Sequence, residues 1–109
     1  MVKYSTDTMF AALGQPVRRS MIEHLAKRGT LSITEMAEPF SISLPAALKH
    51  TQVLEENGLI VRNKKGRVQY CTINNKAFEE MLNWLLFQKK FWESSFVRLE
   101  RHITNRKNK

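Results

Sequence analysis

Residues 31–60 read LSITEMAEPFSISLPAALKHTQVLEENGLI, and no other part of the chain constrains the fold as strongly. The run opens on Ser32-Ile33-Thr34-Glu35, a capping box in which the serine and glutamate side chains each satisfy a backbone N–H at the start of a helix. Pro39 cannot continue that helix, because proline lacks the N–H and its ring clashes with the preceding turn. The run therefore predicts a brief helix over residues 32–40.

A second helix is predicted over residues 43–57. Ser43 is a good N-cap, Pro45 falls in the first turn where proline is tolerated, and Asn57-Gly58 ends the helix. Only Ser41-Ile42-Ser43 separates the two helices, counting the cap. A helix–turn–helix this tight is the geometry that places a second helix in the DNA major groove. The competing interpretation is an ordinary helical hairpin, which is common.

The helical wheel of this second helix separates a core face from a free face. Ala47, Thr51 and Leu54 fall on the core face, and His50 lies at its edge. The free face carries a lysine and a glutamine that donate to base edges or phosphates, and leucines suited to thymine methyl groups. The residues of this helix that we predict to contact DNA are Ser43, Leu44, Pro45, Leu48, Lys49 and Gln52.

Residues 59–73 predict a β-hairpin. Strand-forming residues fill 59–63, the side chains of 67–73 alternate between two faces, and Lys64-Lys65-Gly66 lies between the strands. A basic hairpin directly after a helix–turn–helix is where a wing reaches flanking phosphates or the minor groove. The alternative is a solvated turn whose lysines keep an edge strand from aggregating. The wing residues that we predict to contact DNA are Arg62, Lys64, Lys65 and Arg67.

Helices are also predicted on either side of these elements. Residues 7–13 form a short helix that stops at Gly14, and a second helix begins at Pro16 and ends at Gly29. The last helix spans 75–104, about 30 residues and roughly 45 Å, because neither glycine nor proline follows Gly66. The prediction is one domain over residues 1–109, mainly α with a small β-hairpin, in the winged helix–turn–helix order α-α-α-α-β-β-α.

The last helix carries two apolar stripes. The first has the alternating four-three spacing of helix–helix association, broken only at Lys89, and comprises Phe78, Leu82, Leu85, Trp92, Phe96, Leu99 and Ile103. The second comprises Met81, Trp84, Phe87 and Phe91. Two stripes indicate two neighbours, the protein's own body and another chain, whereas one wide apolar face would suit a monomer. We predict a homodimer whose interface includes the first helix and comprises Met9, Phe10, Leu13, Leu85, Trp92, Phe96, Leu99 and Ile103.

Composition indicates the kind of partner. The 109 residues include 18 Lys and Arg against 10 Asp and Glu, a formal net charge of +8. This charge favours a polyanion, with nucleic acid ahead of an anionic membrane surface. The single cysteine, Cys71, excludes an internal disulfide and any site built from several cysteines of one chain. No apolar run is long enough to span a membrane and no secretory signal is visible, which predicts a reducing cytoplasm.

In combination, these residues resemble a known family. The run at 31–60, with Arg62, Gly66-Arg67 and Tyr70 after it, resembles the ArsR-type winged helix–turn–helix transcription regulators, as does ALGQPVRRSMIEHL at 12–25. The match covers about residues 8–103. A subgroup without the classical metal sites has a similar tail, carried here by Trp84-Leu85, Phe91-Trp92-Glu93 and Arg98-Leu99.

The resemblance implies a homodimer that binds a pseudo-palindromic operator in double-stranded DNA and represses transcription, in the bacterial cytoplasm at the nucleoid. Residues 43–57 would be the reading helix and residues 59–73 the wing. Two positions depart from the family, since Leu48 stands where a small polar residue is common and Thr51 where a leucine is common. Because Leu48 alters a DNA-facing contact, the operator sequence cannot be carried over.

We predict no metal site, no cofactor and no enzymatic activity. The cysteine pair of metal-sensing members is missing from residues 33–40, and the last helix offers His102 with scattered glutamates. No catalytic constellation is visible in the sequence. Two alternatives stay open. One is a sensor of an oxidant, through Cys71, or of an unknown small-molecule effector, with DNA binding as its output. The other is a winged-helix module that docks on a partner protein.

Overall fold

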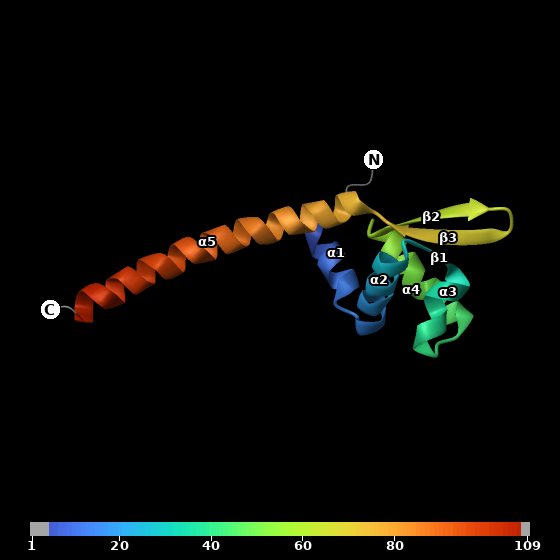
Figure 1. The fold of residues 1–109 in the computed structure, drawn as a ribbon, viewed down its shortest axis with the longest axis horizontal. Coiled ribbons are helices and arrows are strands. Elements are labelled where there is room, and N and C mark those ends of the chain that lie inside the picture. The colour runs from blue at the N-terminus through green and yellow to red at the C-terminus, as the bar shows by residue number, and fades with distance from the viewer. Residues whose placement is uncertain (1–4, 108–109) are drawn as a thin grey trace.

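The computed structural model describes residues 5–107, and the side chains of residues 5–104. Figure 1 shows a body of short helices and a small sheet, from which the last helix and the β-hairpin extend in opposite directions. The elements are α1 (Thr6–Leu13), α2 (Pro16–Arg28), β1 (Thr30–Ser32), α3 (Ile33–Ala37), a 3₁₀ turn (Glu38–Phe40), α4 (Leu44–Glu56), β2 (Ile60–Lys65), β3 (Val68–Ile73) and α5 (Asn75–Lys107). The predicted winged helix–turn–helix fold is confirmed.

The helix starts form as the sequence predicts. Ser32 Oγ accepts from the Glu35 N–H at 3.2 Å, and Glu35 Oε1 accepts from the Ser32 N–H at 2.9 Å. This capping box lowers the pKa of the Glu35 carboxyl, because the carboxylate accepts the Ser32 backbone N–H. Ser43 Oγ caps α4 by accepting from the Ala46 N–H at 3.2 Å. Ser41 turns the chain between the helices with a left-handed φ of 51°.

The sheet has one strand more than the sequence predicts. Its three antiparallel strands lie in the order β1-β3-β2, so residues 30–32 add an edge strand to the hairpin. Leu31 of this strand is buried opposite Cys71 of β3. The sequence does not predict this strand, because three residues are too few to show a strand's hydrophobic alternation and because they adjoin the capping box of α3.

The hairpin turn also lies further along the chain than predicted. Lys65 pairs with Val68, so the turn is Gly66-Arg67, and Lys64 and Lys65 belong to β2. Gly66 has a φ of 63°, a left-handed conformation that favours glycine in two-residue hairpin turns. The wing is therefore a ladder with a minimal tip, and its lysines have the alternating orientation of strand residues.

The core lies where α1–α4 and the sheet meet. Thr51 is fully buried in it, and its hydroxyl donates to the Leu48 carbonyl at 2.9 Å, which satisfies the polar atom inside the apolar core. Asn74 Nδ2 donates to the Gly58 carbonyl at 2.8 Å and fixes the start of α5 against the end of α4. Of α5, Ala77 and Met81 are buried in this core.

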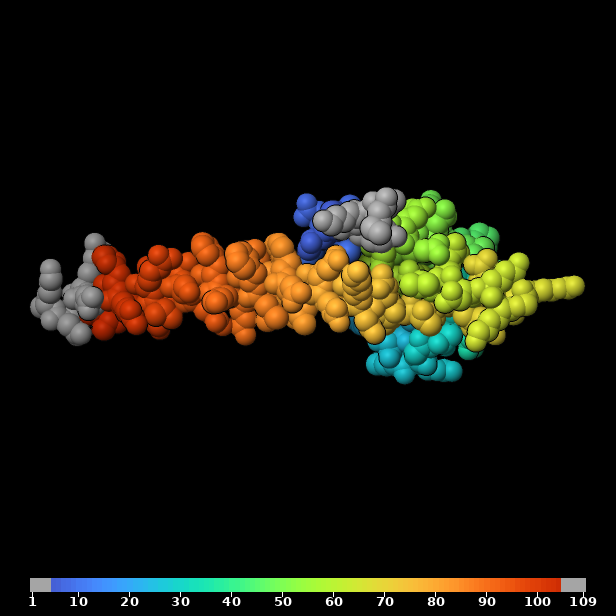
Figure 2. Space-filling model, turned by 90° about the horizontal axis from the view of Figure 1, so that it is seen from above, coloured from blue at the N-terminus to red at the C-terminus, as the bar shows by residue number. Residues whose placement is uncertain are grey.

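The rest of α5 extends away from the body. Its 33 residues make a helix of roughly 50 Å, and the chain measures 73 × 34 × 20 Å. The radius of gyration is 19.6 Å, whereas a compact chain of this length has about 13 Å. Figure 2 shows residues 82–104, which we call the arm, as a projecting rod. Among residues 5–107, no helix is both long enough and apolar enough to cross a membrane.

Candidate nucleic-acid interface

The outer face of α4 is exposed, as the helical wheel predicts. The inner face packs Ala47, Thr51 and Leu54 into the core with no exposed surface, which fixes the rotation of the helix about its axis. The six residues predicted to contact DNA are all exposed, and we call them the reading face: Ser43, Leu44, Pro45, Leu48, Lys49 and Gln52. The structure thus presents one side of α4 as a continuous polar and apolar surface.

His50 lies at the border between the two faces of α4 and is partly exposed. Burial lowers the pKa of its imidazole, and the nearby charges of Arg18 and Lys49 lower it further. Both effects favour the neutral imidazole. Among the six residues of the reading face, the charged side chain is that of Lys49.

The wing presents three of its four predicted cations to solvent. Lys64, Lys65 and Arg67 are exposed at and beside the Gly66-Arg67 turn. Cations at the tip of a hairpin are placed to approach phosphates on both sides of a groove.

Arg62 behaves differently from the other wing cations. Its Nη2 lies 2.9 Å from Glu55 Oε1, its Nε donates to the same oxygen at 3.1 Å, and its side chain is 23% exposed. The alternation of β2 places Arg62 on the same side as the buried Ile60, toward α4. Its charge is paired with Glu55, and this pair braces the wing against α4, so Arg62 is less exposed than the other three wing cations.

A hollow of about 430 Å³ joins the reading face to the wing. Leu44 and Leu48 line it from α4, and Ser32, Ile33 and Thr34 line it from the start of α3. Its other wall is Arg67, Val68 and Gln69 of the wing. Val68 and Gln69 were absent from the sequence prediction, because they lie beside Leu44 and Leu48 only in the folded chain. The two predicted DNA-contacting elements form one surface.

The residues predicted for a dimer interface divide between the body and the arm. Met9 is 1% exposed, so it is enclosed in its own protomer's core and offers no surface to a partner. Phe10 packs on Trp84 with ring centroids 5.5 Å apart and planes inclined by 58°, which fastens α1 to the start of α5, and Leu13 packs against the core. The remaining five residues are 44–66% exposed on α5: Leu85, Trp92, Phe96, Leu99 and Ile103.

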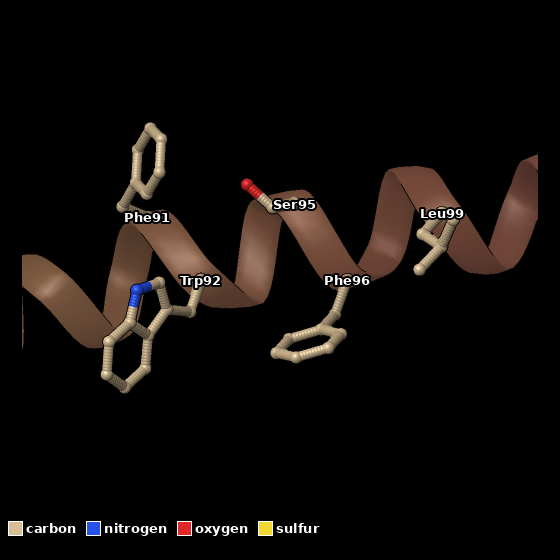
Figure 3. Close-up of a pocket in the computed structure, with 5 residues that line it drawn as sticks. All are labelled: Phe91, Trp92, Ser95, Phe96 and Leu99. Atoms are coloured by element: carbon tan, nitrogen blue, oxygen red, sulfur yellow. The ribbon is translucent and has the colours of Figure 1, made fainter.

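The arm exposes aromatic side chains on two sides. Figure 3 shows Trp92 and Phe96 pointing to one side of the helix, and Phe91 and Ser95 pointing to the other. These four residues and Leu99 line an open hollow of about 550 Å³. The second predicted stripe is divided, because Met81 and Trp84 contact the body whereas Phe87 and Phe91 are exposed.

Cys71 lies in the middle of β3 and is fully buried. Burial raises the pKa of its thiol to about 11, although the nearby Arg62 guanidinium acts in the opposite direction. The sequence suggested that basic neighbours activate this thiol, and in the structure burial outweighs them. Among the side chains that the structure describes, no group of three His, Cys, Asp or Glu residues converges to hold a metal ion.

Comparison with known proteins gives a consistent result. A family model described as a helix-turn-helix domain matches residues 13–63. The transcriptional repressor SdpR of Bacillus subtilis (strain 168) is 30% identical over 80 residues, which cover 73% of this chain and 88% of that protein. The uncharacterized HTH-type transcriptional regulator YuzN of the same strain is 31% identical over 86 residues, covering 72% of this chain and 94% of that protein.

Solved structures extend the similarity beyond the helix–turn–helix. The crystal structure of an ArsR family transcriptional regulator has 38% sequence identity and a TM-score of 0.76, and the match covers 86% of this chain and 98% of that one. An ArsR-like transcriptional regulator from Rhodococcus sp. RHA1, at 22% identity, shows the same fold with a TM-score of 0.76 over 88% of this chain and 90% of that one. This chain therefore belongs to the ArsR family of winged helix–turn–helix, DNA-binding transcription regulators.

Proposed function

We propose that this protein is a homodimeric repressor that binds a pseudo-palindromic operator in the bacterial chromosome. Each protomer inserts the reading face of α4 into the major groove, and the two insertions are one helical turn of DNA apart, about 34 Å. The observation that carries the proposal is the continuity of the exposed α4 face with the exposed wing cations Lys64, Lys65 and Arg67. Occupation of an operator by such a dimer blocks access of other proteins to the same DNA.

The arm supports the dimer. Its large apolar side chains are about half exposed from Leu82 to Ile103, an apolar surface of the kind that marks a protein interface. A two-fold axis along paired arms would repeat the same surface on both protomers and present two copies of α4 to DNA. The relative SdpR is named a transcriptional repressor, which supports repression as the sign of regulation here.

These observations support the two alternative functions that the sequence left open less well than they support DNA binding. A module that docks on a protein does not need the net charge of +8 or three exposed cations at a wing tip. An oxidant sensor needs a reactive thiol, and the Cys71 thiol is buried with a raised pKa. DNA binding is the function that uses both the exposed face of α4 and the wing cations.

The test is DNA affinity measured by fluorescence anisotropy over a series of salt concentrations, on genomic fragments selected by the wild-type protein. Lys49→Ala should weaken binding to the selected fragment more than binding to bulk DNA, because Lys49 lies on the reading face. Lys64→Ala and Lys65→Ala should each weaken binding to any DNA and lower the salt slope by about 1.8 per dimer, from two lost phosphate contacts.

Lys90→Ala is the matched control, since it removes an equal charge from an exposed lysine on the arm and should leave the slope unchanged. Unchanged affinity in the three interface variants would contradict DNA binding by this surface. A salt slope lowered as much by Lys90→Ala would show that net charge, rather than the wing, determines the affinity.

A further inference from the structure

We infer that Leu44 and Leu48 read thymine 5-methyl groups, so that each operator half-site carries thymines beneath the first turns of α4. This inference rests on the proposed DNA-binding function and adds to it the chemistry of the sequence that is recognised. The feature behind it is a pair of large apolar side chains on a surface that is otherwise polar and cationic.

The two leucines form one apolar element. They are four residues apart in α4, so their side chains are neighbours on the helix surface, and they are 49% and 41% exposed. Both line the 430 Å³ hollow, whose wing side includes Val68, another exposed apolar residue. The interior side of α4 is already filled by Ala47, Thr51 and Leu54, so the exposed part of the two leucines is free to contact a ligand.

The charges around the hollow fix the orientation in which DNA meets these leucines. Lys49 follows Leu48 on α4, and Arg67 lines the wing side of the hollow. Cations on both sides of an apolar centre bind phosphates at the rim and leave the centre against base edges. Leu44 and Leu48 are therefore directed to the floor of the major groove rather than to the sugar–phosphate backbone.

The chemistry of leucine then limits which base it favours. A leucine side chain has neither donor nor acceptor, and covering a polar base edge with it removes that edge's hydrogen bonds to water. Of the four bases, only thymine presents an apolar group in the major groove, its 5-methyl group. Contact with thymine buries apolar surface on both partners, whereas contact with any other base buries a polar edge against a hydrocarbon.

Gln52 continues the same line along the helix. It lies four residues after Leu48 and is exposed, and glutamine pairs with the N6 and N7 edge of adenine. A helix that presents two leucines and a glutamine in line is thus matched to A·T pairs, with thymine methyls under the leucines. The prediction is a half-site enriched in A·T pairs at the positions covered by residues 44–52.

The experiment begins with selection of duplexes from a random-sequence library by the wild-type protein, which should enrich thymine in each half-site. Each half-site thymine is then replaced in turn by deoxyuridine, which lacks only the 5-methyl group. At the contacted positions, the wild-type protein should bind about three- to fivefold more weakly per methyl group removed. This loss corresponds to the burial of one methyl-sized group.

Variants then identify the side chain that contacts each methyl group. Leu48→Ser and Leu44→Ser replace exposed residues and should fold normally, and each should bind the thymine and deoxyuridine duplexes equally at its own position. Val61→Ser is the matched control, since Val61 is 42% exposed on β2 and does not line the hollow. It should keep the full preference for the methyl group.

Two results would overturn the inference while leaving DNA binding intact. One is a selected duplex that binds specifically but equally well with thymine or deoxyuridine at every half-site position. The other is a full methyl preference that survives in both leucine variants. A library from which the protein selects no sequence would instead overturn the proposed function, and this inference with it.

Discussion

Helices α4 and α5 both carry an apolar stripe, but only α4 covers its stripe within its own protomer. The apolar side of α4 is completely buried at Ala47 and Leu54, whereas Trp92 and Phe96 of α5 are 58% and 66% exposed. The 3.6-residue period marks each helix as amphipathic in the same way. What the period does not encode is whether the covering surface belongs to the same chain or to another copy.

The physical difference lies in length and attachment. α4 has 13 residues, ends at Glu56 with Asn57 as its C-cap, and packs against α2, α3 and β2. α5 has 33 residues, and only its first turns contact α1 and the core. A helix longer than its domain leaves its distal apolar residues in water until a partner covers them. The arm is thus the region where the proposed dimer is most open to test.

The largest effect on operator affinity is expected from disrupting the proposed dimer interface on the arm. Trp92→Glu combined with Phe96→Glu places two charges in the proposed interface, and a buried unpaired charge is costly. Sedimentation should show a change from a dimer to a single 12.7 kDa subunit. Operator affinity should fall about 100-fold or more, because the second half-site is no longer bound from a tethered partner.

Ser94→Glu is the control for this variant, since it adds a charge to an exposed polar position of the same helix. It should leave both the mass and the affinity unchanged. A wild-type protein that sediments as a single subunit at micromolar concentration would refute the proposed dimer. A doubly substituted arm that still sediments as a dimer would place the interface elsewhere.

The second prediction compares leucine-to-alanine substitutions on the buried and the exposed sides of α4 by their effect on the free energy of unfolding. Leu54→Ala creates a cavity in the core and should lower the free energy of unfolding by about 2–5 kcal/mol. Leu48→Ala removes an exposed side chain and should change it by about 0.5 kcal/mol or less. Urea denaturation followed by circular dichroism measures both. Equal destabilisation by the two variants would mean that Leu48 is covered in solution.

Local signals account for what the sequence predicts well about the fold. The capping box at Ser32, the N-cap Ser43 and the glycine at 29 each act within one helical turn, so their effect is visible in adjacent residues. β1 has no such signal, because a strand of three residues is defined by its partner β3, about 40 residues further along the chain. The sequence therefore gives the helices and the hairpin but not the full sheet.

The same distinction between local signals and long-range contacts applies to the residues of the candidate site. The exposure of the reading face follows from the wheel of one helix, so it could be predicted from sequence for all six residues, whose contact with DNA stays a prediction. Arg62 is different, because its partner Glu55 belongs to another element and only the packing of β2 on α4 brings them together. Met9 and Cys71 show a similar limit. Burial is set by the whole fold, and neighbouring letters do not reveal it.

The smallest effect on operator affinity is expected from oxidation of Cys71. The experiment compares this thiol, which is enclosed in the body, with a thiol placed on the exposed arm. Because the pKa of this thiol rises from 9.0 to about 11, its thiolate fraction at pH 8 falls about 100-fold, and burial slows its reaction further. Iodoacetamide should therefore modify the native protein at least about 100-fold more slowly than the urea-unfolded chain. Peroxide should leave operator affinity unchanged.

A thiol moved to the arm provides the comparison. Ser94→Cys in a Cys71→Ala background places the sulfur on an exposed helical position, where alkylation should be as fast in the native as in the unfolded protein. Rapid native alkylation of Cys71 itself, accompanied by loss of operator affinity in peroxide, would instead favour the oxidant-sensor alternative. The native alkylation rates of the two thiols should therefore differ, because the body excludes iodoacetamide and the exposed position on the arm does not.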